Sequence, residues 1–138
     1  MKLIGLDYGR RRIGVATTDE TGGFIRSCPT IDRTACGDSI RAVCDVIKRE
    51  NPDRIIIGLP LDTRDAETGM SLEIRAFAAK LAKAASVPVE FVDESLTSRR
   101  AHDIIRMRKK KHRRAKENVD RIAACLILEA YQQEKQCG

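Results

Sequence analysis

The sequence predicts an α/β protein with one mixed, five-stranded sheet flanked by helices. Three observations predict it: three closely spaced strand patterns at the N-terminus, two later continuous apolar runs, and helical spacing of apolar residues between and after those runs. The chain has 138 residues, of which 42% are hydrophobic and 33% charged. This size and composition predict a single globular domain over residues 1–138 and exclude a disordered chain.

The first three strands are expected to form an antiparallel meander, because only short connections join them. About four residues, 9–12, link the first two strands, and Thr21-Gly22-Gly23 forms the next turn. Pro29 has no N–H to donate, so the third strand is either broken there or placed at an edge of the sheet. The two later runs are typical of buried parallel strands reached by helical crossovers. The expected strands are 2–7, 13–18, 24–31, 55–59 and 87–92.

The helices are expected between and after these strands. Asp38 or Ser39 caps the first, which stops at Asn51-Pro52. Thr97 or Ser98 caps the third, and the last helix has the clearest apolar repeat. The expected helices are 38–49, 71–85, a third beginning at 97 or 98, and 117–134. The inward residues expected for the second are Leu72, Ile74, Phe77, Ala78 and Leu81.

The cysteines and histidines argue against a disulfide framework and a zinc site. The five cysteines are odd in number and contain no Cys-x-x-Cys pair, and there are only two histidines. Any metal would therefore be held by carboxylates, which select magnesium or manganese. Gly5 and Asp7 interrupt the apolar segment that a signal peptide would need at the N-terminus. No run approaches the ~20 apolar residues of a membrane span. We expect a cytoplasmic protein with no membrane contact.

One short segment accounts for the basic character of the chain. The net charge is +6, yet without the eight basic residues between 106 and 116 the count is 18 basic against 20 acidic, a net charge of −2. Such a run is either a solvated charged loop or a phosphate-binding patch, and we favour nucleic-acid contact. The hairpin arginines beside Asp7 could extend the patch or only be solvated. The candidate nucleic-acid-binding residues are Arg10, Arg11, Arg12, Arg108, Lys109, Lys110, Lys111, Arg113, Arg114 and Lys116.

Acidic residues stand where the predicted structure does not need them. Asp7 ends the first strand, Asp93 and Glu94 end the last, and Asp120 lies beside the apolar stripe of the last helix. Strand alternation places Asp93 and Glu94 on opposite faces, so only one of them can share a site with Asp7. Asp7, Asp93 and Glu94 could instead cap a turn or helix, and Asp120 could be an acid in the first helical turn that the helix dipole favours. Together they predict a carboxylate cluster holding two Mg²⁺ or Mn²⁺ ions about 4 Å apart, a site suited to phosphodiester cleavage.

The sequence resembles the YqgF/RuvX family in four motifs that occur in the family's order along the whole chain. They are Asp7-Tyr8-Gly9 with Arg12-Ile13-Gly14-Val15-Ala16, Ile57-Gly58-Leu59-Pro60-Leu61, Asp93-Glu94-x-Leu96-Thr97, and Val119-Asp120-x-Ile122-Ala123-Ala124. The resemblance implies a ribonuclease H-like fold related to Holliday junction resolvases. It implies a nuclease that matures the 5′ end of precursor 16S ribosomal RNA. Carried over by motif position, the catalytic acids are Asp7, Glu94 and Asp120, with Asp93 the fallback for Glu94.

One departure concerns the residue after the Asp-Glu pair, where family members often carry arginine and this chain has Ser95. Arg99 or Arg100 could supply the missing basic contact. The expected activity is a metal-dependent endonuclease acting on structured RNA or branched DNA, with precursor 16S rRNA or a pre-ribosomal particle as partner, as a monomer or homodimer. Two alternatives remain: a non-catalytic RNA-binding ribosome assembly factor, and an ATP-binding domain of the sugar-kinase and actin kind, which the short chain disfavours.

Overall fold

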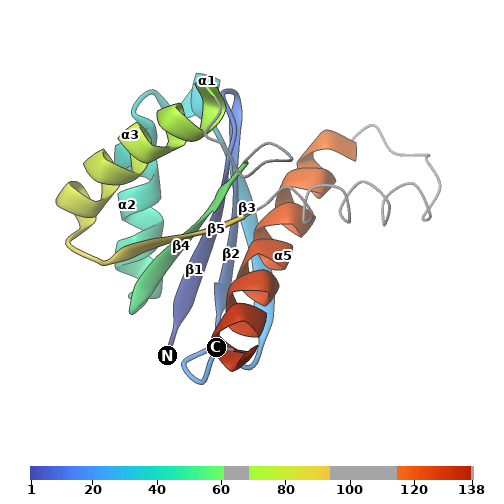
Figure 1. Ribbon diagram of the computed structural model, residues 1–138. Helices are drawn as coiled ribbons and strands as arrows, with labels where there is room; N and C mark the ends of the chain where they lie inside the picture. The colour runs from blue at the N-terminus through green and yellow to red at the C-terminus, as the bar shows by residue number, and fades with distance from the viewer. Residues whose placement is uncertain (61–68, 94–114, 138) are drawn as a thin grey trace.

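The computed structural model describes residues 1–60, 69–93 and 115–137; within the last helix it describes side chains only for residues 122–135. Figure 1 shows a twisted sheet with helices on both faces. The strands are β1 (Leu3–Tyr8), β2 (Arg12–Thr18), β3 (Ile25–Asp32), β4 (Arg54–Leu59) and β5 (Val89–Asp93). The helices are α1 (Arg33–Cys36), α2 (Ser39–Glu50), α3 (Gly69–Ala85) and α5 (Ala115–Cys137).

The strand order is β3-β2-β1-β4-β5. β1, β2 and β3 form the antiparallel meander, whereas β4 pairs parallel to both β1 and β5. The carboxyl ends of β1, β4 and β5 therefore lie at one edge of the sheet, which is the usual location of ligand sites in open α/β sheets. The prediction of a meander plus two parallel strands is confirmed.

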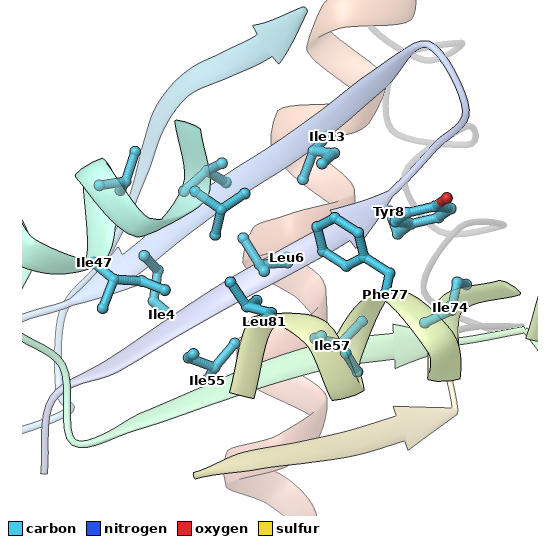
Figure 2. Packing of buried hydrophobic residues seen from close by; sticks show 14 of the residues in the cluster. Ile4, Leu6, Tyr8, Ile13, Ile47, Ile55, Ile57, Ile74, Phe77 and Leu81 are labelled. Atoms are coloured by element: carbon cyan, nitrogen blue, oxygen red, sulfur yellow. The ribbon is translucent and has the colours of Figure 1, made fainter. Parts of the chain in front are cut away.

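Each face of the sheet has its own cluster of buried side chains. α2 and α3 cover one face, where large buried residues such as Leu6, Ile57 and Phe77 pack together (Figure 2). α5 covers the other face, over a smaller cluster that contains Ala16, Ala124 and several larger residues. Strand alternation explains the division, because neighbours such as Ile56 and Ile57 of β4 point to opposite faces.

The ends of α2 follow the sequence signals closely. The Asp38 carboxylate accepts hydrogen bonds from the backbone N–H groups of Ile40 (3.0 Å) and Arg41 (3.3 Å), which fixes the start of the helix. Asn51 adopts the left-handed conformation with φ 50° and donates its N–H to the carbonyl of Ile47, which ends it. Among the residues that the structure describes, no helix is long and apolar enough to cross a membrane.

Several sequence expectations need correction. The third strand runs one residue later than predicted, and Phe24, expected to begin it, is 78% exposed. Leu72, expected to face inward, is 59% exposed, because it lies two residues, or about 200° around the helix, from the inward Ile74. The short α1 was not predicted, since four residues carry no apolar repeat. The third predicted helix, beginning at Thr97 or Ser98, lies outside the described residues.

Candidate active site

Asp7 lies near the carboxyl end of β1 on the face covered by α5. Residues Leu3 and Asp7 share one face by alternation, and Leu3 packs in the cluster under α5. Asp7 pairs across β2 with Gly14. On the other side Leu6 of β1 pairs with Ile57 of β4, so the next position after each brings Asp7 level with Gly58. The Asp7 side chain is half-buried.

The two strands beside Asp7 present no side chains at its level, because both neighbouring positions are glycine. Gly14 lies at an irregularity in the β2–β3 pairing, between Ile13 and Val15. Gly58 pairs onward with Val92 of β5. Glycine inside a strand sacrifices packing and typically marks the close approach of a backbone or ligand. Within the sheet, the positions on either side of Asp7 therefore carry no side chain that would compete with a ligand of its carboxylate.

α5 lies close against β1 at Gly5, two residues before Asp7. A Cβ atom on Gly5 would lie 2.7 Å from Cγ of Leu128 and 3.0 Å from the carbonyl oxygen of Ala124. Figure 1 shows α5 running antiparallel to β1, with the two chain ends adjacent. Along the helix axis, position 120 lies about 6 Å before Ala124, because four residues of α-helix rise by that amount. Along the strand, Asp7 lies about 6.6 Å beyond Gly5. Ideal helix and strand rises therefore extrapolate position 120 of α5 to about the level of Asp7 along the sheet.

Of the two predicted acids at the end of β5, the structure describes one, Asp93. Asp93 ends β5, pairs with Leu59 and has an exposed side chain. Val92 packs in the cluster under α5, whereas Phe91 packs against the cluster under α2 and α3. Alternation therefore places Asp93 on the face of Phe91, away from Asp7. Glu94 lies outside the described residues.

The donor set suits a hard divalent cation. Carboxylates, the predicted ligands, are the groups that magnesium and manganese prefer, and the strand positions beside Asp7 are glycines. The described side chains contain no group of three or more acidic, histidine or cysteine residues placed to hold a metal. Of the predicted acids Asp7, Glu94 and Asp120, only Asp7 has a described side chain.

The predicted nucleic-acid-binding residues divide into a described hairpin and segments beyond the described ranges. Arg10 lies in the β1–β2 turn, where its Nε contacts the Glu73 carboxylate at 3.1 Å. Arg11 is exposed in the same turn, and Arg12 begins β2. Position 116 lies in α5, and the structure describes its backbone alone. The residues outside the described ranges are Arg99, Arg100, Arg108, Lys109, Lys110, Lys111, Arg113 and Arg114.

The structure also reveals contacts around the turn after Asp7 that the sequence did not single out. Tyr8 donates its hydroxyl to the carboxylate of Glu73 at 2.8 Å, and Arg33 donates to the carbonyl of Gly9 at 2.9 Å. These partners lie 65 and 24 residues away along the chain. No local pattern could have predicted them, because the pairing depends on how α1 and α3 pack on the sheet.

The family follows from comparison with known proteins. Residues 1–134 match the family model described as RuvX, Holliday junction resolvase. The chain belongs to the RuvX family. Among curated relatives, proteins named "Putative pre-16S rRNA nuclease" from Thermosynechococcus vestitus and Syntrophus aciditrophicus are 35% and 34% identical to it; each alignment spans 95% of this chain and 87% of the relative. The predicted family is confirmed, and this RuvX chain is a nuclease that hydrolyses phosphodiester bonds and binds nucleic acid.

Solved structures give the same fold. The RuvX chain resembles Thermus thermophilus RuvC with a TM-score of 0.61 at 17% identity, covering 98% of this chain and 97% of that one. It also resembles the Fowlpox virus resolvase solved with Holliday junction DNA, with a TM-score of 0.60 at 17% identity over 100% of both chains. At this identity the likeness shows the fold alone, and it confirms the predicted ribonuclease H-like class.

Proposed function

We propose that this RuvX protein is a metal-dependent endonuclease that processes the 5′ end of precursor 16S ribosomal RNA. The observation that carries the proposal is the position of Asp7, at the carboxyl end of β1, between two glycines and level with position 120 of α5. The RNA substrate is taken from the names of the curated relatives.

The proposed catalytic acids are Asp7, Glu94 and Asp120. Asp7 comes from the strand and Asp120 from the helix that passes within contact distance of that strand. Glu94 is preferred to Asp93 because Val92 faces α5 and Asp93 lies on the other side of the sheet. By strand alternation, position 94 falls on the same face as Val92, which is also the face of Asp7.

These carboxylates would hold two Mg²⁺ or Mn²⁺ ions. Bound there, such ions activate a water molecule and stabilise the leaving oxygen of the scissile phosphodiester. The protein's own contribution is to hold the carboxylates in place and to admit the substrate backbone over Gly14 and Gly58. The basic run before α5 would bind the neighbouring phosphates and orient the strand, with Arg10, Arg11 and Arg12 as further contacts.

The test is cleavage of precursor 16S RNA with its 5′ extension, in Mg²⁺ or Mn²⁺, by wild type and by Asp7→Asn. Loss of a partner of a metal ligand already costs about 10–100-fold, so loss of a ligand should lower turnover by more than about 100-fold. Binding of the RNA should change little, because the substitution removes no phosphate contact. Asp93→Asn is the matched control, an acid at the same sheet edge but on the opposite face, and it should cleave normally.

The outcomes separate this proposal from its alternatives. Cleavage of a four-way DNA junction but not of the RNA would assign the protein to DNA processing. Binding of RNA without cleavage under any divalent metal would favour the non-catalytic assembly factor. Equal activity of wild type and Asp7→Asn would exclude Asp7 as a catalytic residue.

A further inference from the structure

The turn that follows Asp7 is held by an arginine from a distant part of the sequence. Arg33 begins α1, and its Nη1 donates to the carbonyl oxygen of Gly9 at 2.9 Å. Its Nε donates to the hydroxyl of Ser39 at 2.9 Å, at the start of α2. Its backbone N–H donates to the carbonyl of Arg11 at 2.8 Å. Three bonds therefore tie the turn between β1 and β2 to the first two helices.

The same guanidinium group covers the ring of Tyr8, the residue directly after Asp7. Its Cζ lies 4.8 Å from the Tyr8 ring centroid and 5.8 Å from that of Phe77. The two rings contact each other at 4.9 Å with an interplanar angle of 57°. Figure 2 shows Tyr8 at the end of β1 with Phe77 of α3 beside it. Tyr8 is thus packed between α3 and Arg33.

A carboxylate completes the enclosure of Tyr8. Glu73 accepts the Tyr8 hydroxyl at 2.8 Å and the Nε of Arg10 at 3.1 Å. These two hydrogen bonds, the first from Tyr8 and the second from Arg10, lower the pKa of Glu73, so its carboxylate stays ionised at neutral pH. Both ends of the Tyr8 side chain and the next carbonyl group along the backbone are consequently fixed.

The turn itself has little freedom to adjust. A Cβ atom on Gly9 would lie 2.5 Å from the carbonyl oxygen of Arg12, so the chain reverses within a space that admits no side chain. Because peptide planes are rigid, fixing Tyr8 and the Gly9 carbonyl restricts the backbone of Asp7 on its carboxyl side. Metal and catalytic ligands need placement within about 0.5 Å, which a hairpin end without such restraint would not provide.

We infer that Arg33 is a positioning residue for Asp7: it holds the Tyr8–Gly9 turn so that the Asp7 carboxylate keeps the orientation needed at the metal site. The inference rests on the proposed function, since it takes Asp7 as a metal ligand. Both described side-chain hydrogen bonds of Arg33 go to neutral acceptors within the protein, on two different elements. This use of the planar guanidinium fork, together with stacking, is one that lysine cannot reproduce.

The experiment compares Arg33→Ala and Arg33→Lys with wild type, and Arg26→Ala serves as the control. Arg26 also makes a side-chain bond, to Glu50 at 2.8 Å, but at the far end of the sheet from Asp7. Two quantities are measured on protein shown to be folded by circular dichroism. They are kcat and KM for RNA cleavage in Mg²⁺, and the affinity for Mn²⁺ alone by electron paramagnetic resonance.

Both Arg33 variants should lower kcat by about 10–100-fold and weaken Mn²⁺ binding by a similar factor, as loss of a partner behind a metal ligand does. KM should stay within about threefold, because Arg33 does not contact the substrate. Arg26→Ala should lose some stability and keep both kcat and Mn²⁺ affinity. Arg33→Lys retains the charge and most of the stem, so it keeps the test valid if the alanine variant does not fold.

A rise in KM at constant kcat would overturn the inference, because it would make Arg33 a substrate-binding residue. Wild-type kcat and Mn²⁺ affinity in both variants would overturn it as well. Asp7→Asn, measured in parallel, separates the two proposals. If Asp7→Asn cleaves normally, the proposed site fails and the role of Arg33 fails with it; if Asp7→Asn is inactive while Arg33 variants are normal, only the role of Arg33 fails.

Discussion

Gly5→Ala is expected to weaken both the fold and the catalysis, by adding one methyl group beneath α5. Gly5 is fully enclosed in the middle of β1. Its new Cβ would lie 2.7 Å from Cγ of Leu128 and 3.0 Å from the carbonyl oxygen of Ala124. Leu128 is fully buried, so its close-packed neighbours oppose rotation of its side chain, and the carbonyl of Ala124 is fixed in the helix backbone. The helix must therefore move away from the strand.

The size of the effect follows from ordinary packing distances. Carbon atoms pack best at about 3.5–4.0 Å, so the contact with Leu128 is short by about 1 Å. Overpacking of this kind costs about 1–3 kcal/mol. For a chain of this length such a loss lowers Tm by about 3–10 °C. A displacement of about 1 Å at a site can lower turnover about 100-fold, and here it separates position 120 from Asp7.

Thermal unfolding followed by circular dichroism and cleavage of precursor RNA test the two parts separately. Gly69→Ala is the matched control, because a Cβ atom on Gly69, the first residue of α3, meets nothing within 4 Å. The control should leave Tm and turnover close to those of wild type. A Gly5→Ala protein with wild-type Tm would refute the packing argument. A destabilised but fully active protein would show that the close approach of α5 does not position the catalytic groups.

Three further predictions concern other parts of the molecule. Burial would raise the pKa of Glu50, but hydrogen bonds and charges from Arg26 and Lys2 outweigh it and lower the pKa. The ionised carboxylate therefore stabilises the fold fully at pH values above the ordinary glutamate pKa of 4.5. Wild type should have a higher Tm than Glu50→Gln at pH 7, and this difference should vanish as the pH falls through the lowered pKa of Glu50. A constant difference from pH 7 to pH 3 would contradict the prediction. Burial raises the pKa of the Cys125 thiol to about 11, so at pH 8 it should react with a disulfide reagent far more slowly than exposed Cys36, and equal rates would contradict the burial. Neutralising the basic run should weaken RNA binding, and the slope of log affinity against log salt concentration should fall by about 0.7 for each phosphate that the protein no longer binds. An unchanged slope would refute the role of the run in binding phosphates. The substituted residues are Lys109, Lys110, Lys111, Arg113 and Arg114.

The topology could be predicted from the sequence because it depends on local signals. Short turns predicted the meander, and the apolar run of β4 predicted a central strand. Pro29 left open a broken strand or an edge strand, and the structure has β3 at the edge. The prediction for Leu72 was wrong because the apolar character of a residue does not determine its angle around the helix. The contact of α5 with Gly5 could not be predicted, since it depends on which strand the helix crosses and how closely.

The candidate site shows the same division between local and distant information. Asp7 could be singled out because an acid at the end of a buried strand contradicts strand preferences. The face on which Asp93 lies could not be predicted from the sequence, because it depends on which face α5 covers. The packing of Val92 under α5 and of Phe91 on the other side places Asp93 on the face away from Asp7. The role inferred for Arg33 had no sequence signal, because its contacts join residues 24 positions apart.

The asymmetry of the two faces gives a physical reason for these observations. Under α2 and α3 the sheet carries branched and aromatic residues, each worth about 1.5–3 kcal/mol on burial. Along the α5 face, Gly5 and Ala16 replace such residues, as do Gly14 and Gly58 at the level of Asp7. A chain selected for stability alone would fill these positions. Leaving them small lets α5 approach the sheet closely beside a core that still contains large residues such as Ile56 and Leu128. The face covered by α5 therefore combines stability with the positions that the proposed site needs.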